Sequence, residues 1–195
     1  MAYIGMRKPI VAPVNSRVDG SAVTYLTPMV IGPAVSANVT FDTADNPDYG
    51  DDIIIDNDKG VNGYSITLET NDITKEARAA CLGWELKTSG GSTEYEITDA
   101  PPPEVGLGYI RVKMFKGAKK YEGFFFHALQ FTSGGENAST KQKQITWNHP
   151  TMTGTGLGVY NDASGKAKFF DWAEFATEAA GIAWIYGKFG AQVPA

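Results

Sequence analysis

Cysteine and histidine are nearly missing from this sequence of 195 residues. Cys81 is the only cysteine, so an intrachain disulfide is excluded, and its alanine-rich surroundings predict a small buried apolar residue. The only histidines, His127 and His149, form no His-x-x-x-His pair, and the chain contains no Gly-x-Ser-x-Gly elbow. Because no nucleophile, paired acid or metal site can be assembled from these residues, we expect neither catalysis nor a cofactor.

An excess of positive charge is absent as well, because 17 Lys and Arg residues stand against 22 Asp and Glu residues, giving a net charge of -5. Proteins that hold DNA through its phosphates need clustered Lys and Arg, so stable DNA binding is not expected. The most apolar long stretch, residues 169–189, carries Asp171, Glu174 and Glu178 and does not predict a membrane span. Residues 7–9 interrupt any signal peptide with charge and proline, and we expect synthesis in a reducing cytosol.

Turn-forming residues are abundant, with 22 Gly and 10 Pro, and 43% of the residues are hydrophobic. This composition favours a sheet protein with many turns over a helical bundle, and the length suits one domain. Three prolines within the first 28 residues predict an arm or edge segments rather than a core strand. We therefore expect an N-terminal arm over residues 1–30, a single domain over 31–190 and a short tail over 191–195.

Two segments alternate between apolar and polar residues, and an acidic stretch separates them. The alternation over residues 35–42 and 64–70 predicts two half-buried strands. Residues 43–62 contain six aspartates, two glycines and a proline, and predict a long extended loop. Residues 56–60 begin like a calcium loop but lack the EF-hand spacing and its final glutamate, so a solvated acidic loop is favoured over a metal site.

Two helices are predicted. The first is capped by Asn71 or Asp72 and ends at Leu82, before Gly83. The second starts near Asp171 and provides the last element of the domain.

A hairpin is predicted between the two helices. Residues 108–116 alternate as a strand, residues 116–119 form a turn, and residues 121–132 return as a strand that is apolar on both faces. Such a strand belongs inside a sandwich or beneath a partner. With a further strand over residues 144–153, the order of elements predicts an α+β protein that is mainly antiparallel β.

Lysines gather at the predicted hairpin turn, and their charge is opposite to that of the acidic loop. Taken alone, they keep an exposed turn soluble. Taken with the loop, they complement a second copy of the chain in a head-to-tail arrangement. On that interpretation, the residues that mediate assembly are Asp45, Asp48, Asp51, Asp52, Asp56, Asp58, Lys113, Lys116, Lys119 and Lys120.

Five segments carry, in order, a spacing shared with one known family. They are the start MAYIGMRKPI at 1–10, AVSANVT at 34–40 before an acidic stretch, and LETNDIT at 68–74. Residues 106–131, with a basic turn and an aromatic strand ending in Gln-Phe, and GKAKFFDWAEFA at 165–176 complete the set, continuing to Ala-Trp-Ile at 183–185. Across nearly its whole length, the chain resembles the phage major tail proteins of the phi13 type.

The resemblance implies a tail tube protein of a long-tailed bacteriophage, with two packed antiparallel sheets flanked by a helix. Copies would form hexameric rings that stack into a hollow tube through which DNA is ejected. The implied partners are further copies, the tape measure protein, the tail terminator and the distal tail protein, with DNA only in transit and no membrane. The implied location is the virion tail, assembled in the bacterial host cytoplasm.

Within such a tube, the polar faces of the two alternating strands are expected to line the lumen. These candidates are Ser36, Asn38, Thr40, Asp42, Ser65, Thr67 and Glu69. The candidates for the core or the subunit boundary are Phe124, Phe125, Phe126, Phe131, Trp172 and Phe175. Two other classes remain open: the inner tube of a contractile tail or injection device, and a β-sandwich carbohydrate-binding module that uses Trp84 and Trp147.

Overall fold

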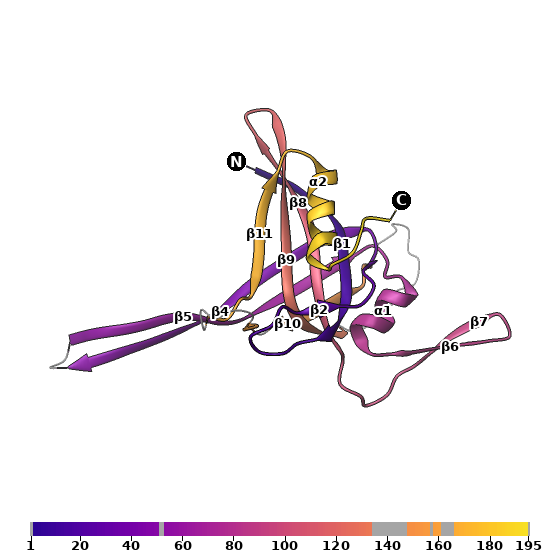
Figure 1. Cartoon of the computed structure of the whole chain (residues 1–195), viewed down its shortest axis with the longest axis horizontal. Coiled ribbons are helices and arrows are strands. Elements are labelled where there is room, and N and C mark those ends of the chain that lie inside the picture. Colours follow the sequence, from indigo (N-terminus) through magenta and orange to yellow (C-terminus); the bar gives the residue numbers. More distant parts are fainter. Residues whose placement is uncertain (1, 51–52, 134–147, 157, 161–165, 195) are drawn as a thin grey trace, which may run out of the picture.

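The computed structural model describes residues 2–50, 53–133, 148–156, 158–160 and 166–194, and this part is mainly β with two helices (Figure 1). The elements are β1 (Ala2–Ser16), β2 (Thr24–Tyr25), β3 (Met29–Val30), β4 (Ala34–Gly50), β5 (Ile53–Thr70), α1 (Lys75–Leu82), β6 (Glu85–Ser89), β7 (Ser92–Glu96), β8 (Glu104–Phe115), β9 (Ala118–Ser133), β10 (Thr151–Gly156), β11 (Phe170–Phe175) and α2 (Glu178–Lys188). Each pairing between these strands is antiparallel, which confirms the predicted α+β, mainly β class.

One large sheet contains nine of these strands. Its order is β2-β1-β8-β9-β10-β5-β4, with β3 also paired to β1 and β11 also paired to β9, whereas β6 and β7 form a separate hairpin. In Figure 1, β8, β9 and β11 run steeply while β4 and β5 cross them, and β4 contacts β1 from the other end of the sheet. The family resemblance implied two packed sheets, whereas the described strands of the body form one sheet that bends until its ends approach.

A β-bulge in β9 marks the place where the sheet divides. The register shifts between Val105 and Leu107 of β8, so that Gly106 lies opposite both His127 and Ala128. On its other edge, β9 pairs with β11 before the bulge and with β10 after it. The extra residue therefore lets β9 pair along one edge with two strands, β11 and β10, that run in different directions.

Two tyrosine hydroxyls hold the backbone of this bulge. The Tyr25 hydroxyl donates a hydrogen bond of 2.9 Å to the carbonyl of His127, and the Tyr64 hydroxyl donates one of 2.9 Å to the carbonyl of Ala128. Burial raises the pKa of both hydroxyls, so both remain protonated donors. Because an unsatisfied buried carbonyl is costly, these bonds stabilise the division of the sheet.

The core has two parts, on opposite faces of β8 and β9. Phe125 and Phe126 are neighbours in the chain and point to opposite faces, and each is only 1% exposed. Phe126 joins a larger cluster with β5, β10 and α1, and Phe125 joins a smaller cluster with β1 and α2. The prediction of a strand buried on both faces is confirmed.

The first predicted helix is nearly correct. Its N-cap is Thr74, whose hydroxyl accepts a hydrogen bond from the Ala77 amide, and it ends at Gly83 in the left-handed conformation with φ 71°. The prediction of a helix from Asp171 is wrong, because this residue lies in β11 and α2 begins only after the N-cap Thr177. The free edge of β9 before the bulge accepts a strand there, and this tertiary pairing overrides the helical pattern.

Two segments predicted to be irregular are strands. The expected arm over residues 1–30 contains β1, which pairs with β8 and buries Ile10, Val11 and Ala12 completely. The expected loop over residues 43–62 is the outer part of the β4–β5 hairpin, paired from Thr43 to Gly50. Pro47 is tolerated in β4 because β4 is an edge strand. Of the predicted strand over 144–153, residues 144–147 lie outside the described residues, and β10 begins at Thr151.

Candidate assembly surfaces

A polar face extends over four neighbouring strands, β4, β5, β10 and β9. The register places Ser36, Asn38 and Thr40 of β4 beside Glu69, Thr67 and Ser65 of β5, and the row continues through Thr151, Thr153 and Thr155 of β10 to Thr132 and Gln130 of β9. Glu69 and Thr151 are half-buried and the others are exposed, as is Asp42 further along β4. On the opposite side of β5, Tyr64, Ile66 and Leu68 are buried, so this sheet segment is polar on one face only.

Every predicted lumen candidate therefore belongs to one continuous surface, which we call the polar face. Its side chains are mostly hydroxyls and amides, and one of them, Ser36, donates a hydrogen bond of 2.9 Å to Glu69. The sequence interpretation missed the contribution of β10, although threonine at every second position of residues 151–155 is the same period-two signal. Among the apolar residues of the alternating segment 35–42, Val35 and Phe41 are both 41% exposed.

A second surface, the aromatic face, consists of Tyr3, Phe124, Phe170 and Trp172 around Arg111. The Arg111 guanidinium lies 3.9 Å from the Tyr3 ring centroid and 4.6 Å from that of Phe124. Tyr3 is 59% exposed and Trp172 51% exposed, while Phe124 and Phe170 are half-buried against the larger core cluster. Exposed aromatic side chains continuous with a core are typical of a surface that a partner covers.

The candidates for core or boundary residues differ in how deeply their side chains are buried. Phe125, Phe126 and Phe131 are buried core residues, each at most 1% exposed. Phe175 is half-buried and packs against Trp184 of α2 with 5.6 Å between ring centroids. Of the two candidates in the aromatic face, Trp172 is 51% exposed and Phe124 is half-buried.

The predicted basic turn is present, but two of its lysines are engaged within the chain. Lys116 and Gly117 form the turn with φ values of 47° and 81°. Lys113 bonds Glu122 at 2.7 Å and Glu174 at 2.5 Å, and Lys120 bonds Glu174 at 2.6 Å. These hydrogen bonds raise the pKa of Lys113 to about 12. Burial of Glu122 opposes its ionisation, yet hydrogen bonds from Lys113 and Arg111 hold its pKa below the usual value.

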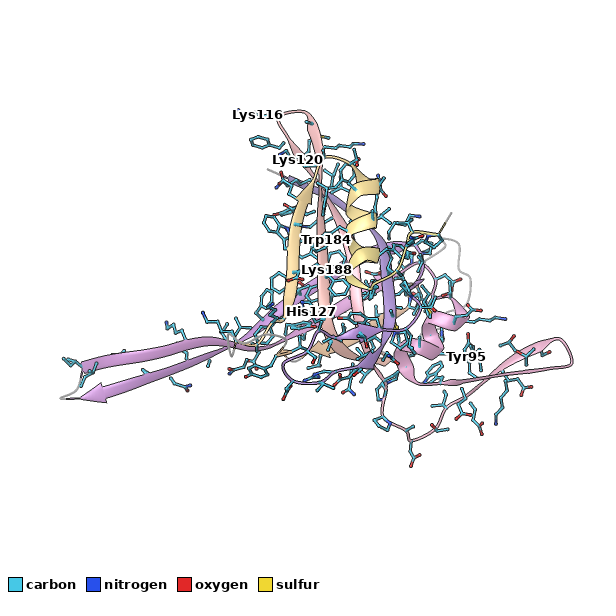
Figure 2. The ribbon with its side chains drawn as sticks, viewed as in Figure 1. Tyr95, Lys116, Lys120, His127, Trp184 and Lys188 are labelled. Atoms are coloured by element: carbon cyan, nitrogen blue, oxygen red, sulfur yellow. The ribbon has the colours of Figure 1, made fainter. Side chains whose placement is uncertain are left out.

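The positive charge that this turn offers to a partner is therefore carried by Lys116 and Lys119, both exposed at the end of the β8–β9 hairpin. Figure 2 shows Lys116 at that end, far from the outer part of the β4–β5 hairpin, which projects from another side of the molecule. The two oppositely charged hairpins of one molecule therefore do not meet.

The outer part of the β4–β5 hairpin carries exposed aliphatic side chains as well as aspartates. Ile53, Ile54 and Ile55 are 65%, 56% and 67% exposed. Asp45 is exposed and lies 3.7 Å from the Lys59 ammonium. Of the other candidates, Asp48, Asp56 and Asp58 fall on the paired backbone, while Asp51 and Asp52 lie outside the described residues.

A polar cluster around the buried His127 links β9 to β11 and α2. His127 Nε2 is buried and lies 3.4 Å from Asp171 Oδ2 without a hydrogen bond, and Asp171 is bonded by Lys188 of α2 (Figure 2). Burial is the main cause that lowers the pKa of His127, aided by Lys188 and Lys168 and opposed by Asp171. The folded protein therefore keeps this histidine neutral.

This cluster predicts a pH dependence of stability. Because the pKa of His127 is lower in the folded than in the unfolded chain, stability is fully present above about pH 6.5 and falls as the pH drops below it. The loss is at most about 1.4 kcal/mol per pH unit, the limit for one proton. Melting temperatures measured from pH 7.5 to 5 should decline for the native chain and much less for His127→Gln. Equal slopes would show that His127 does not titrate in this way; the slope is informative even if the variant is less stable throughout.

Among the described residues, no three His, Cys, Asp or Glu side chains are grouped so as to hold a metal ion, and no helix is long and apolar enough to cross a membrane. Burial raises the pKa of the Cys81 thiol to about 12, so this side chain is a core residue and not a nucleophile. In comparisons with known proteins, no family model matches the chain. No curated protein matches it either.

Proposed function

We propose that this chain is a structural protein, the major tail tube subunit of a long-tailed bacteriophage, whose copies form hexameric rings that stack into a hollow conduit for DNA. The observation that carries the proposal is the polar face: four adjacent strands present hydroxyl, amide and a few acidic groups on one side and a buried core on the other. Such a surface, repeated around a ring, gives a hydrated wall with weak affinity for DNA.

Unpaired strand edges supply the means of lateral assembly. β4 stands at the end of the sheet order, so one of its edges is free of partners among the described strands, and β11 is likewise paired only to β9. Free edges invite pairing with another chain. The aromatic face lies beside β11 and adds apolar area, which a neighbouring copy in a ring would cover.

The opposite charges of the two hairpins support stacking of rings. The β4–β5 hairpin is acidic and projects from the body, whereas the β8–β9 turn exposes two lysines at a different end (Figure 1). A heterologous contact between such surfaces repeats without closing and generates a filament. In this role the chain acts in the virion tail after assembly in the host cytoplasm, and its other partners are the tape measure, tail terminator and distal tail proteins.

Negative-stain microscopy of the concentrated protein tests the proposal directly. We expect hexagonal rings or tubes with a central channel, alone or after seeding with tail tips. A chain that remains monomeric under both conditions contradicts it. The inner tube of a contractile tail would give the same images, and a sheath gene beside this one would favour that alternative.

A carbohydrate-binding module receives less support from the structure. Trp84 is half-buried and lies in edge contact with Tyr95 at 5.8 Å between ring centroids, and the Arg78 guanidinium lies 5.7 Å from the Trp84 ring centroid. This ring is thus not a free platform for a sugar. Trp147 lies outside the described residues.

Reversing charge on the polar face should make the tube retain DNA. Each lysine placed there gains a phosphate contact, so assembled tubes of Asp42→Lys, Glu69→Lys should bind DNA with a salt dependence that native tubes lack. Particles that carry the variant should release DNA more slowly at equal assembly. Glu94→Lys, an exposed charge reversal on the separate β6–β7 hairpin, is the control. Retention and release identical to those of the native tube would exclude this face from the lumen.

A further inference from the structure

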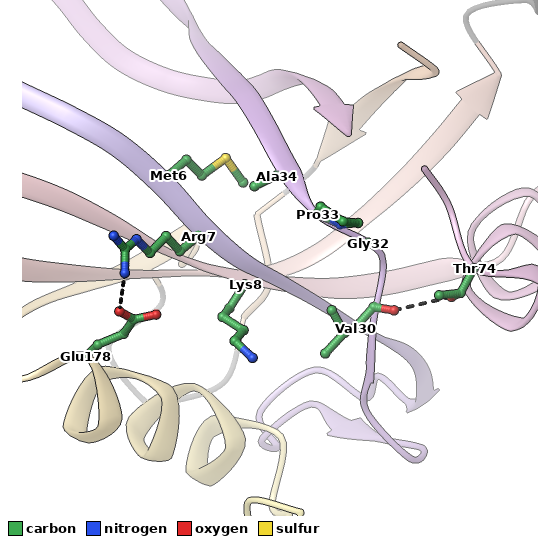
Figure 3. A pocket seen from close by; sticks show the side chains of 9 residues that line it. All are labelled: Met6, Arg7, Lys8, Val30, Gly32, Pro33, Ala34, Thr74 and Glu178. Carbon is green, nitrogen blue, oxygen red and sulfur yellow. Dashed lines mark hydrogen bonds and ion pairs between the residues drawn. The ribbon is translucent and has the colours of Figure 1, made fainter. Parts of the chain in front are cut away.

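A groove of about 640 Å³ opens between β1 and the segment that leads from β3 into β4 (Figure 3). Its walls include Met6 and Lys8 of β1 and Val30, Pro33 and Ala34 on the other side. In Figure 3 the Met6 side chain extends towards Ala34 across the groove. The lining is mainly apolar, and no acidic partner of Lys8 is present among the described residues.

Local backbone features create this groove. Lys8 has a φ of 51°, a conformation that non-glycine residues rarely adopt, and it lies where the β1–β8 register shifts. On the N-terminal side of Pro9, the outer edge of β1 has no partner among the described strands. On the other side of the groove, Gly32 lets the chain pass close to the backbone of Asp72, because a Cβ there would lie 1.9 Å from the Asp72 carbonyl oxygen. The result is an open apolar slot beside a free strand edge.

The exposed isoleucines of the β4–β5 hairpin match the apolar lining of this groove. Ile53, Ile54 and Ile55 are more than half exposed, an unusual density of aliphatic surface on a projecting element. They lie in a stretch, residues 45–58, that contains six aspartates, and the neighbouring Lys59 pairs with Asp45 at 3.7 Å. The groove is lined by Arg7, Lys8 and Glu178, and because Glu178 bonds Arg7 at 2.7 Å, Lys8 carries the net positive charge of the lining. Apolar surface and charge are therefore complementary at the same time.

The hairpin cannot supply these side chains to its own groove. β4 and β5 carry the isoleucines far from the body of the molecule, while the groove lies on β1 (Figure 1). The contact must come from a different copy, and a contact between unlike surfaces of identical chains repeats head to tail.

We propose that this groove binds the Ile53–Ile55 segment of a second copy of this chain. This inference rests on the proposed function only in requiring that copies assemble; it specifies which surfaces meet. Ile53 and Ile55, which lie on one face of β5, enter the apolar slot beside the β1 edge. The positive charge of Lys8 favours the approach of the aspartate-rich hairpin.

Cysteine cross-linking of the full chain tests this contact. Lys8→Cys and Ile55→Cys combined in one chain should form intermolecular disulfides under mild oxidation, seen as a ladder on a non-reducing gel. Cys81 is completely buried and does not compete. Lys8→Cys with Ile97→Cys is the matched control, because Ile97 is 65% exposed on a different segment. A ladder confined to the first pair supports the inference.

Tubes that form without a ladder, or an equal ladder with the control pair, overturn the inference and leave the proposed function standing. A protein that forms no assembly contradicts both. Independently, Ile53→Ser, Ile55→Ser should raise the concentration required for stacking at least tenfold, while Ile97→Ser should not change it. Unchanged stacking by the double variant would also overturn the inference.

Discussion

Phe125→Asp should yield a chain that does not fold, whereas Trp172→Asp should yield a folded monomer that no longer assembles. The two aromatic side chains lie in adjacent strands, and the register places Trp172 opposite Phe124, next to Phe125 in the chain. They differ in surroundings. Phe125 is 1% exposed and packs edge to face on Phe189 and Tyr25, with ring centroids 4.8 and 5.6 Å away.

A carboxylate at position 125 would be buried among these rings without a partner. The cost of several kcal/mol, added to the lost aromatic packing, is comparable to the whole stability of a typical domain, about 5–15 kcal/mol. At position 172 the carboxylate remains in water because half of the native side chain is already exposed. The monomer therefore loses little, but the aromatic face gains a charge that an apolar contact excludes.

Circular dichroism and thermal melting of both variants, followed by microscopy of the folded one, measure these outcomes. Ile97→Asp is the control for adding a charge at an exposed apolar site. Cooperative melting of Phe125→Asp near the native temperature would contradict the core assignment. Normal tubes of Trp172→Asp would remove the aromatic face from the subunit boundary.

Local signals were sufficient for much of this fold. Alternation over residues 35–42 and 64–70 correctly located parts of β4 and β5, and Gly83 correctly ended α1. The turn at Lys116 and Gly117 was also recognisable, since charged and glycine residues between two strands predict a tight hairpin. These features depend on neighbours within a few positions.

Features that depend on distant pairing could not be predicted in this way. The acidic stretch 43–62 has loop composition, yet its two halves pair with each other as a continuation of β4 and β5. β1 contains prolines, yet its pairing with β8, about 100 positions away, decides its structure. In both cases the ladder hydrogen bonds outweigh local preference.

The candidate surfaces show the same division. Part of the polar face could be predicted, because alternation identified β4 and β5. The contribution of β10 and β9 follows only from the fold, which brings them beside β5. The lysines were correctly placed at a turn, whereas the engagement of Lys113 and Lys120 with Glu122 and Glu174 follows from the register of three strands. Charged residues can be counted from the sequence, but the fold determines which of them are already paired within the chain.

Gly156→Ala should destabilise the protein by about 3 kcal/mol, although alanine normally suits a strand better than glycine. A Cβ at this position would lie 2.0 Å from Cζ and 2.3 Å from the hydroxyl oxygen of Tyr64. The ring cannot move away, because it is 1% exposed and its hydroxyl bonds the carbonyl of Ala128 in the β9 bulge. The melting temperature should fall by roughly 10 °C for a chain of this size.

Two comparisons separate this clash from a general effect of glycine. Gly187→Ala on α2 meets nothing within 4 Å and should stabilise the chain by up to about 1 kcal/mol. In a Tyr64→Ala background the ring is gone, so Gly156→Ala should cost less than about 1 kcal/mol there. If the cost is the same in both backgrounds, Tyr64 is not what excludes the methyl group. If the cost disappears when the Tyr64 ring is removed, Tyr64 requires a glycine at position 156. The tyrosine that bonds the β9 bulge then depends on a glycine in the neighbouring strand.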